Sequence, residues 1–215
     1  MKHAKRICFL FSLLVLFIGG CFGPKQPTRE IEYYTLEYDP PVMESGEPLA
    51  AVIRVDRFRA TPFYDSNKII YRKKSFQRDA YYYRKWRANP GDLVTYFLTR
   101  DMKQSSLFKT VLTSNNNAPA AYVIEGSVDE FLEQDAKDSW EAVLAVSISL
   151  SAVNEPDINK KVLFQKSYFT TETCGQKNLH ALAEAMSVAM TRVSKMIISD
   201  VYNAIARSRN STPEP

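Results

Sequence analysis

The residue in the most distinctive chemical setting is Cys21. It ends a segment that begins with three bases and no acid in Met1–Arg6 and continues with the almost purely apolar run Ile7–Ile18. A basic start, an apolar centre and small residues at the end are the organisation of a secretory signal peptide. The end itself, Ile18-Gly19-Gly20 followed by Cys, resembles the bacterial lipobox, in which the thiol is the nucleophile that receives diacylglycerol. We therefore expect residues 1–20 to be a lipoprotein signal peptide that is removed.

Processing at Cys21 determines how the chain is held. We expect no cofactor other than the diacylglycerol and the N-acyl chain attached to Cys21, with residues 21–30 as an acylated tether. The apolar run is shorter than the ~20 residues that cross a bilayer, so the chain is anchored rather than spanning. Phe22 follows Cys21, and by resemblance to enterobacterial lipoproteins, in which Asp at this position retains the protein in the inner membrane, we expect the outer membrane, facing the periplasm. An ordinary secretory signal with a coincidental Cys is the alternative.

A second chemical signal is the concentration of bases and aromatic rings in residues 57–87. The segment holds ten bases against two acids, together with nine aromatic residues, while the mature chain as a whole has 25 bases and 24 acids. This composition is typical of nucleic-acid surfaces, but a periplasmic lipid anchor makes that partner inaccessible, and we expect no nucleic acid. The candidate contacts for a protein partner or for anionic membrane lipids are Arg72, Lys73, Lys74, Arg84, Lys85 and Trp86. The alternative is that the aromatic side chains pack in the core and the bases form a solvated strand face.

Other residues of catalytic or metal-binding type are isolated. Cys174 and His180 are six residues apart with no third group to orient them, so we interpret Cys174 as a thiol outside any site. Since Cys8 leaves with the signal and Cys21 is acylated, no disulfide is expected. The acidic segment 130–141 is interpreted as a solvated hairpin tip, with a calcium site as the alternative. There is no phosphate-binding glycine loop, so any ATP hydrolysis belongs to another subunit. The two His leave little for a metal site, and we expect none.

The elements that position these residues follow from periodicity. Trp140–Val153 alternates apolar and polar residues, as expected for a long antiparallel strand with one buried face, and residues 121–132 and 161–171 flank it as a meander. Asn89-Pro90-Gly91-Asp92 predicts the start of a helix over 91–104, and Asn178 caps a second helix that ends at Arg207. Shorter strands are predicted at 31–38, 51–56, 68–73, 79–84 and 107–112. This order predicts one α+β domain over 31–206, an antiparallel sheet with two main helices on one face, and a disordered tail at 207–215.

Several of these segments together resemble the ABC-type transport auxiliary lipoproteins. The lipobox Cys21 is followed by Glu32-Tyr33-Tyr34-Thr35-Leu36, which is similar to the first strand of that family. The resemblance continues through Pro62-Phe63-Tyr64-Asp65, the entry to the first helix at residues 82–93, and Ile124-Glu125-Gly126. Arg87-Ala88 stands where members of the family often have an acidic residue, so we assign no role of such an acid to this chain.

The resemblance implies a function without catalysis. It predicts an auxiliary lipoprotein that docks an MCE-domain protein and, through it, an inner-membrane permease, in a lipid transport system that bridges the two membranes. It also implies contact with membrane lipids and a homo-oligomer that shares the symmetry of a ring-shaped partner. The alternative class is an interaction lipoprotein of another envelope machine, such as an outer-membrane assembly factor or a peptidoglycan-synthase activator.

Overall fold

The computed structural model describes residues 30–43 and 46–210. The chain divides into two units, residues 1–30 and 31–215, and the fold is that of the second unit. Cys21, the predicted signal peptide and most of the predicted tether therefore lie outside the described residues, as do the last five residues of the chain.

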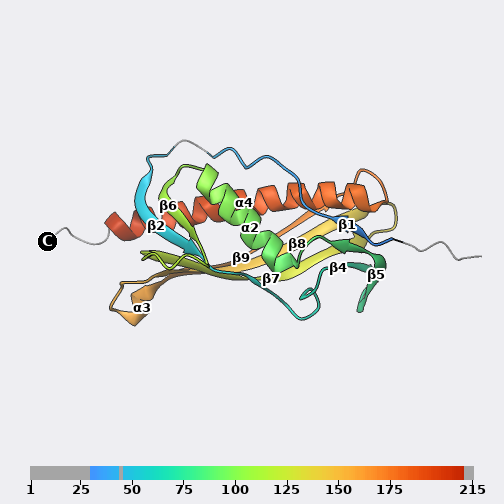
Figure 1. The fold of residues 1–215 in the computed structure, drawn as a ribbon, viewed down its shortest axis with the longest axis horizontal. Coiled ribbons are helices and arrows are strands. Elements are labelled where there is room, and N and C mark those ends of the chain that lie inside the picture. The colour runs from blue at the N-terminus through green and yellow to red at the C-terminus, as the bar shows by residue number, and fades with distance from the viewer. Residues whose placement is uncertain (1–29, 44–45, 211–215) are drawn as a thin grey trace, which may run out of the picture. The chain divides into compact units, whose positions relative to one another are not determined.

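The longest strand of the sheet, β7 (Tyr122–Asp135), organises the domain. Along one side it pairs with β8 (Trp140–Ala152), and β8 pairs with β9 (Val162–Thr173), both in antiparallel register. This is the predicted meander, and its strands are visible along the length of the domain in Figure 1. Its middle strand alternates as predicted, because Leu144, Val146, Ile148 and Leu150 are buried while the serines between them are half-buried on the other face.

The other side of β7 is covered by three strands in succession. They are β2 (Leu49–Val55), β3 (Arg59–Ala60) and β4 (Lys68–Lys74), and each runs parallel to β7. Further strands extend the sheet from there: β6 (Phe108–Thr113) pairs with β2 in parallel, β5 (Gln77–Trp86) forms an antiparallel hairpin with β4, and β1 (Glu32–Tyr34) lies parallel to β5. The predicted antiparallel sheet is therefore mixed, with its parallel pairs made between segments far apart in the sequence.

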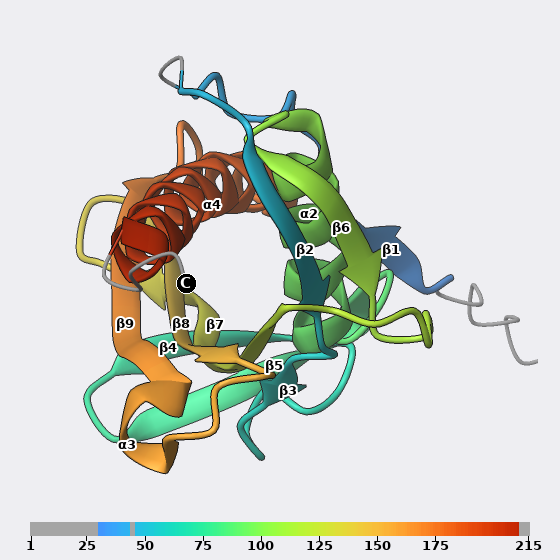
Figure 2. The same cartoon turned by 90° about the vertical axis from the view of Figure 1, so that its left-hand side faces the viewer.

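Two long helices pack on the sheet and against each other. The first, α2 (Pro90–Gln104), begins as predicted, because the Asn89 Oδ1 accepts a 2.8 Å hydrogen bond from the backbone N–H of Gly91. The second, α4 (Leu179–Asn210), lies along β8 and β9 and continues three residues beyond the predicted end at Arg207. Figure 2 shows both helices beside the strands, with the short helix α3 (Ile158–Lys161) in the connection from β8 to β9.

The apolar stripe of α4 forms the centre of the core. Its members are all buried, as the three- and four-residue spacing predicts: Leu179, Leu182, Met186, Met190, Val193, Ile197, Val201 and Ile205. They pack with the buried faces of β7 and β8 into one hydrophobic cluster.

The first strand is shorter than predicted because the chain leaves the sheet after Tyr34 and crosses to the helices. The backbone N–H of Glu37 donates a 3.0 Å hydrogen bond to Ser187 Oγ on α4. The hydroxyl of Tyr38 donates a 2.8 Å hydrogen bond to Asp101 Oδ2 on α2, and Asp101 is buried and paired with Arg100 at 2.7 Å. These contacts with distant residues replace the ladder hydrogen bonds that Thr35–Tyr38 would make in a strand.

Candidate partner-binding surfaces

The bases of the β4–β5 hairpin divide into paired and unpaired groups. Arg72 hydrogen-bonds Gln134 through Nε and lies 3.4 Å from Glu130 through Nη1, and Arg78 reaches the same Glu130 oxygen at 3.4 Å. Arg84 lies 3.2 Å from Glu32 of β1. Three of the ten bases in residues 57–87 are therefore paired with two acids from neighbouring strands, Glu130 and Glu32.

Lys73 and Lys74 remain as exposed cations where the hairpin approaches its turn. Within residues 30–43 and 46–210, neither ammonium lies within ion-pair distance of a carboxylate; Lys73 Nζ lies 5.1 Å from the centre of the Tyr71 ring. Lys85 is half-buried and stands opposite Lys68 in the β4–β5 register. The cationic part of the candidate set is thus concentrated at Lys73 and Lys74.

The structure corrects the prediction for Trp86. Its side chain is 1% exposed, and its ring packs edge-on against Phe131 of β7 with 5.1 Å between the ring centres. The backbone N–H of Trp86 also donates a 2.7 Å hydrogen bond to the carbonyl of Asn67. Trp86 is therefore a core residue that closes the end of β5, and it presents no surface to a partner.

The other aromatic residues of segment 57–87 also divide into buried and exposed side chains. Phe58 and Tyr64 are buried, whereas Phe63, Phe76 and Tyr82 are exposed. Phe76 is fully exposed at the turn between β4 and β5, where its φ is 64°. The alternative interpretation, aromatics inside and bases outside, therefore holds for only part of the segment. The sequence pattern did not identify Phe76, because what distinguishes this residue is its positive φ angle.

The acidic segment at the end of β7 is not entirely solvated, which corrects the prediction for Glu133. This residue is 1% exposed and its Oε2 accepts a 2.9 Å hydrogen bond from the hydroxyl of Tyr81. Burial raises the pKa of Glu133 to about 7, while the Tyr81 hydrogen bond opposes that rise. The cause is the parallel pairing of β4 with β7, which covers this end of the strand.

Cys174 and His180 do not form a thiol–imidazole pair. Cys174 is buried, and burial together with the nearby Glu133 raises the pKa of its thiol to about 11. His180 lies exposed in the first turn of α4. A buried thiol with a raised pKa is a poor nucleophile, which agrees with the interpretation of Cys174 as a thiol outside any site.

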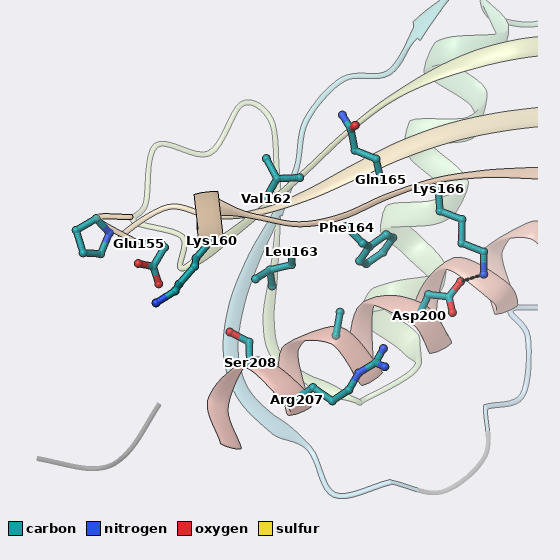
Figure 3. A pocket seen from close by; sticks show the side chains of 12 residues that line it. Glu155, Lys160, Val162, Leu163, Phe164, Gln165, Lys166, Asp200, Arg207 and Ser208 are labelled. Carbon is teal, nitrogen blue, oxygen red and sulfur yellow. Dashed lines mark hydrogen bonds and ion pairs between the residues drawn. The ribbon is translucent and has the colours of Figure 1, made fainter. Parts of the chain in front are cut away.

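A groove lies at the opposite end of the sheet from the hairpin. It has a volume of about 1040 Å³ and runs between the start of β9 and the last turns of α4, next to α3 (Figure 3). Val162, Leu163 and Phe164 give it an apolar wall, and Lys166 forms a 2.7 Å ion pair with Asp200 at its rim. An open groove with an apolar wall and charged edges suits the binding of a partner segment. The sequence predicted only a connection between two strands here and did not predict the groove.

Two further kinds of site, metal centres and membrane-spanning helices, are absent from the described part of the chain. Across residues 30–43 and 46–210 no group of three or more Asp, Glu, His or Cys side chains is arranged to hold a metal ion. No helix in those same residues is both long enough and apolar enough to cross a membrane.

The mixed sheet, its meander and its two packed helices define a single-domain α+β protein with surfaces suited to binding. Residues 34–198 match the family described as the ABC-type transport auxiliary lipoprotein component, which is more than half of the chain. The chain therefore belongs to the ABC-type transport auxiliary lipoprotein family, as its motifs indicated, and is an auxiliary lipoprotein component of ABC-type transport.

Solved structures agree with this fold. Protein XCC0632 from Xanthomonas campestris, of the family DUF330, is similar with a TM-score of 0.76 and 14% identity, over 84% of this chain and 99% of that one. The hypothetical protein CT253 from Chlamydia trachomatis is similar with a TM-score of 0.50 and 10% identity, over 73% of this chain and 98% of that one. No curated protein is significantly similar in sequence.

Proposed function

We propose that the chain is an outer-membrane lipoprotein facing the periplasm, which docks the MCE-domain protein of a periplasm-spanning lipid transport system without catalysing a reaction itself. The observation that carries the proposal is the family match over residues 34–198, combined with a lipobox Cys shortly before the domain begins. An auxiliary component of an ABC-type transporter that is tethered to a membrane is placed to receive the transported lipid or to hold the protein that delivers it. The permease and its ATP hydrolysis then belong to other subunits.

Acylation at Cys21 accounts for the attachment. Two or three acyl chains, at ~0.8 kcal/mol per buried CH₂, hold a protein on a bilayer far more firmly than one myristoyl chain. The segment between Cys21 and Ile31, at most ~36 Å when fully extended, keeps the domain close to that membrane.

The described surfaces support docking rather than transport through this chain alone. The groove beside α3 and the exposed hairpin turn lie at opposite ends of the domain (Figure 1), so a membrane and a protein partner can be contacted at the same time. We expect several copies to assemble around a ring-shaped MCE-domain partner, because a protein that meets a symmetric ring tends to share its symmetry.

The experiment compares the parent with a Cys21→Ser variant after separation of inner and outer membranes. The parent is expected in the outer-membrane fraction with the mass of an acylated Cys at its N-terminus, and to retain the MCE-domain protein on affinity capture. The variant is expected to lose acylation and cleavage and to be absent from the outer-membrane fraction. A Cys21→Ser chain that is still cleaved and still bound to the membrane would contradict the anchor.

The gene context provides an independent test of the partner. Neighbouring genes for an MCE-domain protein and an ABC permease support the transport assignment. Neighbouring genes for a cell-wall synthase, or capture of an outer-membrane assembly factor in place of the MCE-domain protein, would favour the alternative that the chain serves another envelope machine.

A further inference from the structure

The turn of the β4–β5 hairpin has a residue that its backbone disfavours. Lys74 pairs with Gln77, so Ser75 and Phe76 form a two-residue loop. Phe76 has a φ of 64°, a conformation that turns usually assign to Gly or Asn because a side chain is strained there. The ring is fully exposed and therefore gains nothing from the core. A bulky apolar residue in a strained, solvent-exposed position is best explained by a binding surface that covers the residue in the bound state of the protein.

The surroundings of Phe76 indicate what that surface is. Lys73 and Lys74 precede it and are exposed, and Arg78 follows it on β5. Asp79 is the one acid of Lys73–Asp79, and its Oδ1 accepts a 2.8 Å hydrogen bond from the backbone N–H of Ala80. An aromatic ring flanked by lysines is the combination that enters the interface of an anionic membrane, where the ring lies among the acyl chains and each lysine adds attraction to the headgroups.

The position of the hairpin relative to the tether favours a lipid surface over a protein. β1, the first strand after the tether, lies against β5, with Glu32 opposite Arg84. Because β1 runs parallel to β5, Glu32 is the end of β1 nearer to the turn. Phe76 is eight residues along β5 from Arg84, which is ~26 Å at most, and the tether from Cys21 reaches ~36 Å. The turn can therefore contact the membrane in which Cys21 is anchored.

The turn lies at the end of the sheet where β7 ends. Arg72 pairs with Gln134, so Lys74 and the loop extend beyond Asp135, the last residue of β7. The opposite end of β7 pairs with Ala152 and lies near α3, about 45 Å away along the strand. That end also has an exposed apolar residue, Ile158, and two lysines, Lys160 and Lys161. It therefore provides a matched control within the same chain.

We propose that the β4–β5 turn, with Phe76 as the inserting residue and Lys73 and Lys74 as its cationic flank, is a second membrane contact that orients the acylated domain on an anionic lipid surface. This inference rests on the anchoring through Cys21 proposed above. The partner of the basic and aromatic segment 57–87 is then a lipid surface. Its aromatic contact is Phe76 and not Trp86.

The test uses the acylated full-length protein in vesicles of phosphatidylethanolamine and phosphatidylglycerol, with phosphatidylcholine vesicles for comparison. Ser75→Cys places a single accessible thiol beside Phe76, since Cys21 is acylated and Cys174 is buried. Asn159→Cys does the same beside Ile158. An environment-sensitive fluorophore at position 75 is expected to shift to the blue and to be quenched by lipids that carry a quencher in their acyl chains, whereas one at position 159 is expected to emit as in water.

Charge reversal separates the contribution of the lysines from general electrostatics. Lys73→Glu with Lys74→Glu is expected to lower the ratio of docked to undocked turns by at least about 25-fold, which is ~1 kcal/mol for each lysine converted at ~1.4 kcal/mol per factor of ten. Lys160→Glu with Lys161→Glu makes the same change in net charge and is expected to leave the fluorescence at position 75 unaltered. Equal effects of the two pairs would overturn the proposal.

A glycine at position 76 separates function from folding. Phe76→Gly relieves the backbone strain, so it is expected to raise the midpoint of thermal unfolding while it abolishes quenching at position 75. A lower midpoint would show that Phe76 stabilises the fold and would overturn the inference.

The outcomes also distinguish this inference from the proposed function. Failure of the parent to float with vesicles would contradict the anchor. Flotation with a fluorophore at position 75 that remains in water contradicts the second contact alone. If Lys73→Glu with Lys74→Glu abolishes capture of the MCE-domain protein while the fluorophore remains in water, the turn binds protein, and the membrane assignment is wrong.

Discussion

Replacing Glu133 by Gln tests the buried carboxyl at the end of β7. The pKa of Glu133 is raised from 4.5 to about 7 because the side chain is buried. The folded protein therefore binds this proton more tightly than the unfolded chain does. The associated stability is fully present below about pH 4.5, decreases as the pH rises, and is lost above about pH 7. At ~1.4 kcal/mol per tenfold change, the loss amounts to about 3 kcal/mol at most.

Urea unfolding at a series of pH values measures this effect. The parent is expected to lose up to about 3 kcal/mol of unfolding free energy between about pH 4.5 and about 7, relative to Glu133→Gln, which carries no ionisable group at this site. Glu125→Gln is the control, because Glu125 lies on the same strand but is exposed. Removing the hydroxyl that stabilises the ionised carboxyl, in Tyr81→Phe, is expected to steepen the loss. The same pH dependence in the parent and in Glu133→Gln would refute this account of the burial.

Three further substitutions test the packing that holds the surfaces in place, each by urea unfolding. Asp101→Ala leaves Nε and Nη2 of Arg100 and the hydroxyl of Tyr38 without an acceptor and is expected to cost ~3–5 kcal/mol; a loss below ~1 kcal/mol would show that Asp101 does not fix the crossing segment. Gly126→Ala places a Cβ 2.6 Å from Phe58 Cε2 and 2.7 Å from the carbonyl of Ser147, so ~1–3 kcal/mol should be lost, and a neutral result would mean that Phe58 moves freely. Trp86→Ala is expected to cost ~3–5 kcal/mol through the cavity beside Phe131, whereas a change confined to partner binding would restore Trp86 as a surface contact.

Local patterns predicted the elements whose stability is local. The Asn89 cap and the proline after it placed the start of α2, and the alternation of β8 placed its buried face, because both signals depend on neighbouring residues in the chain. The stripe of α4 was equally clear, since one face of a long helix must cover the sheet. These elements established the α+β class before any contact was known.

Contacts between distant residues decided what the sequence could not show. β1 ends early because Glu37 and Tyr38 bond to Ser187 and Asp101, residues far along the chain. The parallel pairing of β2, β3 and β4 with β7 is set by the tertiary fold, and it made the sheet mixed.

The same limit applied to the candidate site. Trp86 was interpreted as a surface residue because basic residues surround it in sequence, yet Phe131 buries it. Arg72 and Arg84 form ion pairs with acids on adjacent strands. Phe76 could be recognised only from its backbone angle and exposure. The composition of residues 57–87 therefore indicated where to look, and the structure selected which side chains are accessible.

The central claim is that this auxiliary lipoprotein docks an MCE-domain protein from the outer membrane. It is tested most directly by affinity capture of the acylated chain from solubilised cell envelopes, which contain both membranes, with the bound proteins identified by mass spectrometry. The account predicts an MCE-domain protein, together with its ABC permease, retained by the parent and lost with Cys21→Ser. An acylated outer-membrane chain that retains a peptidoglycan synthase or an outer-membrane assembly factor, with no MCE-domain protein, would contradict it.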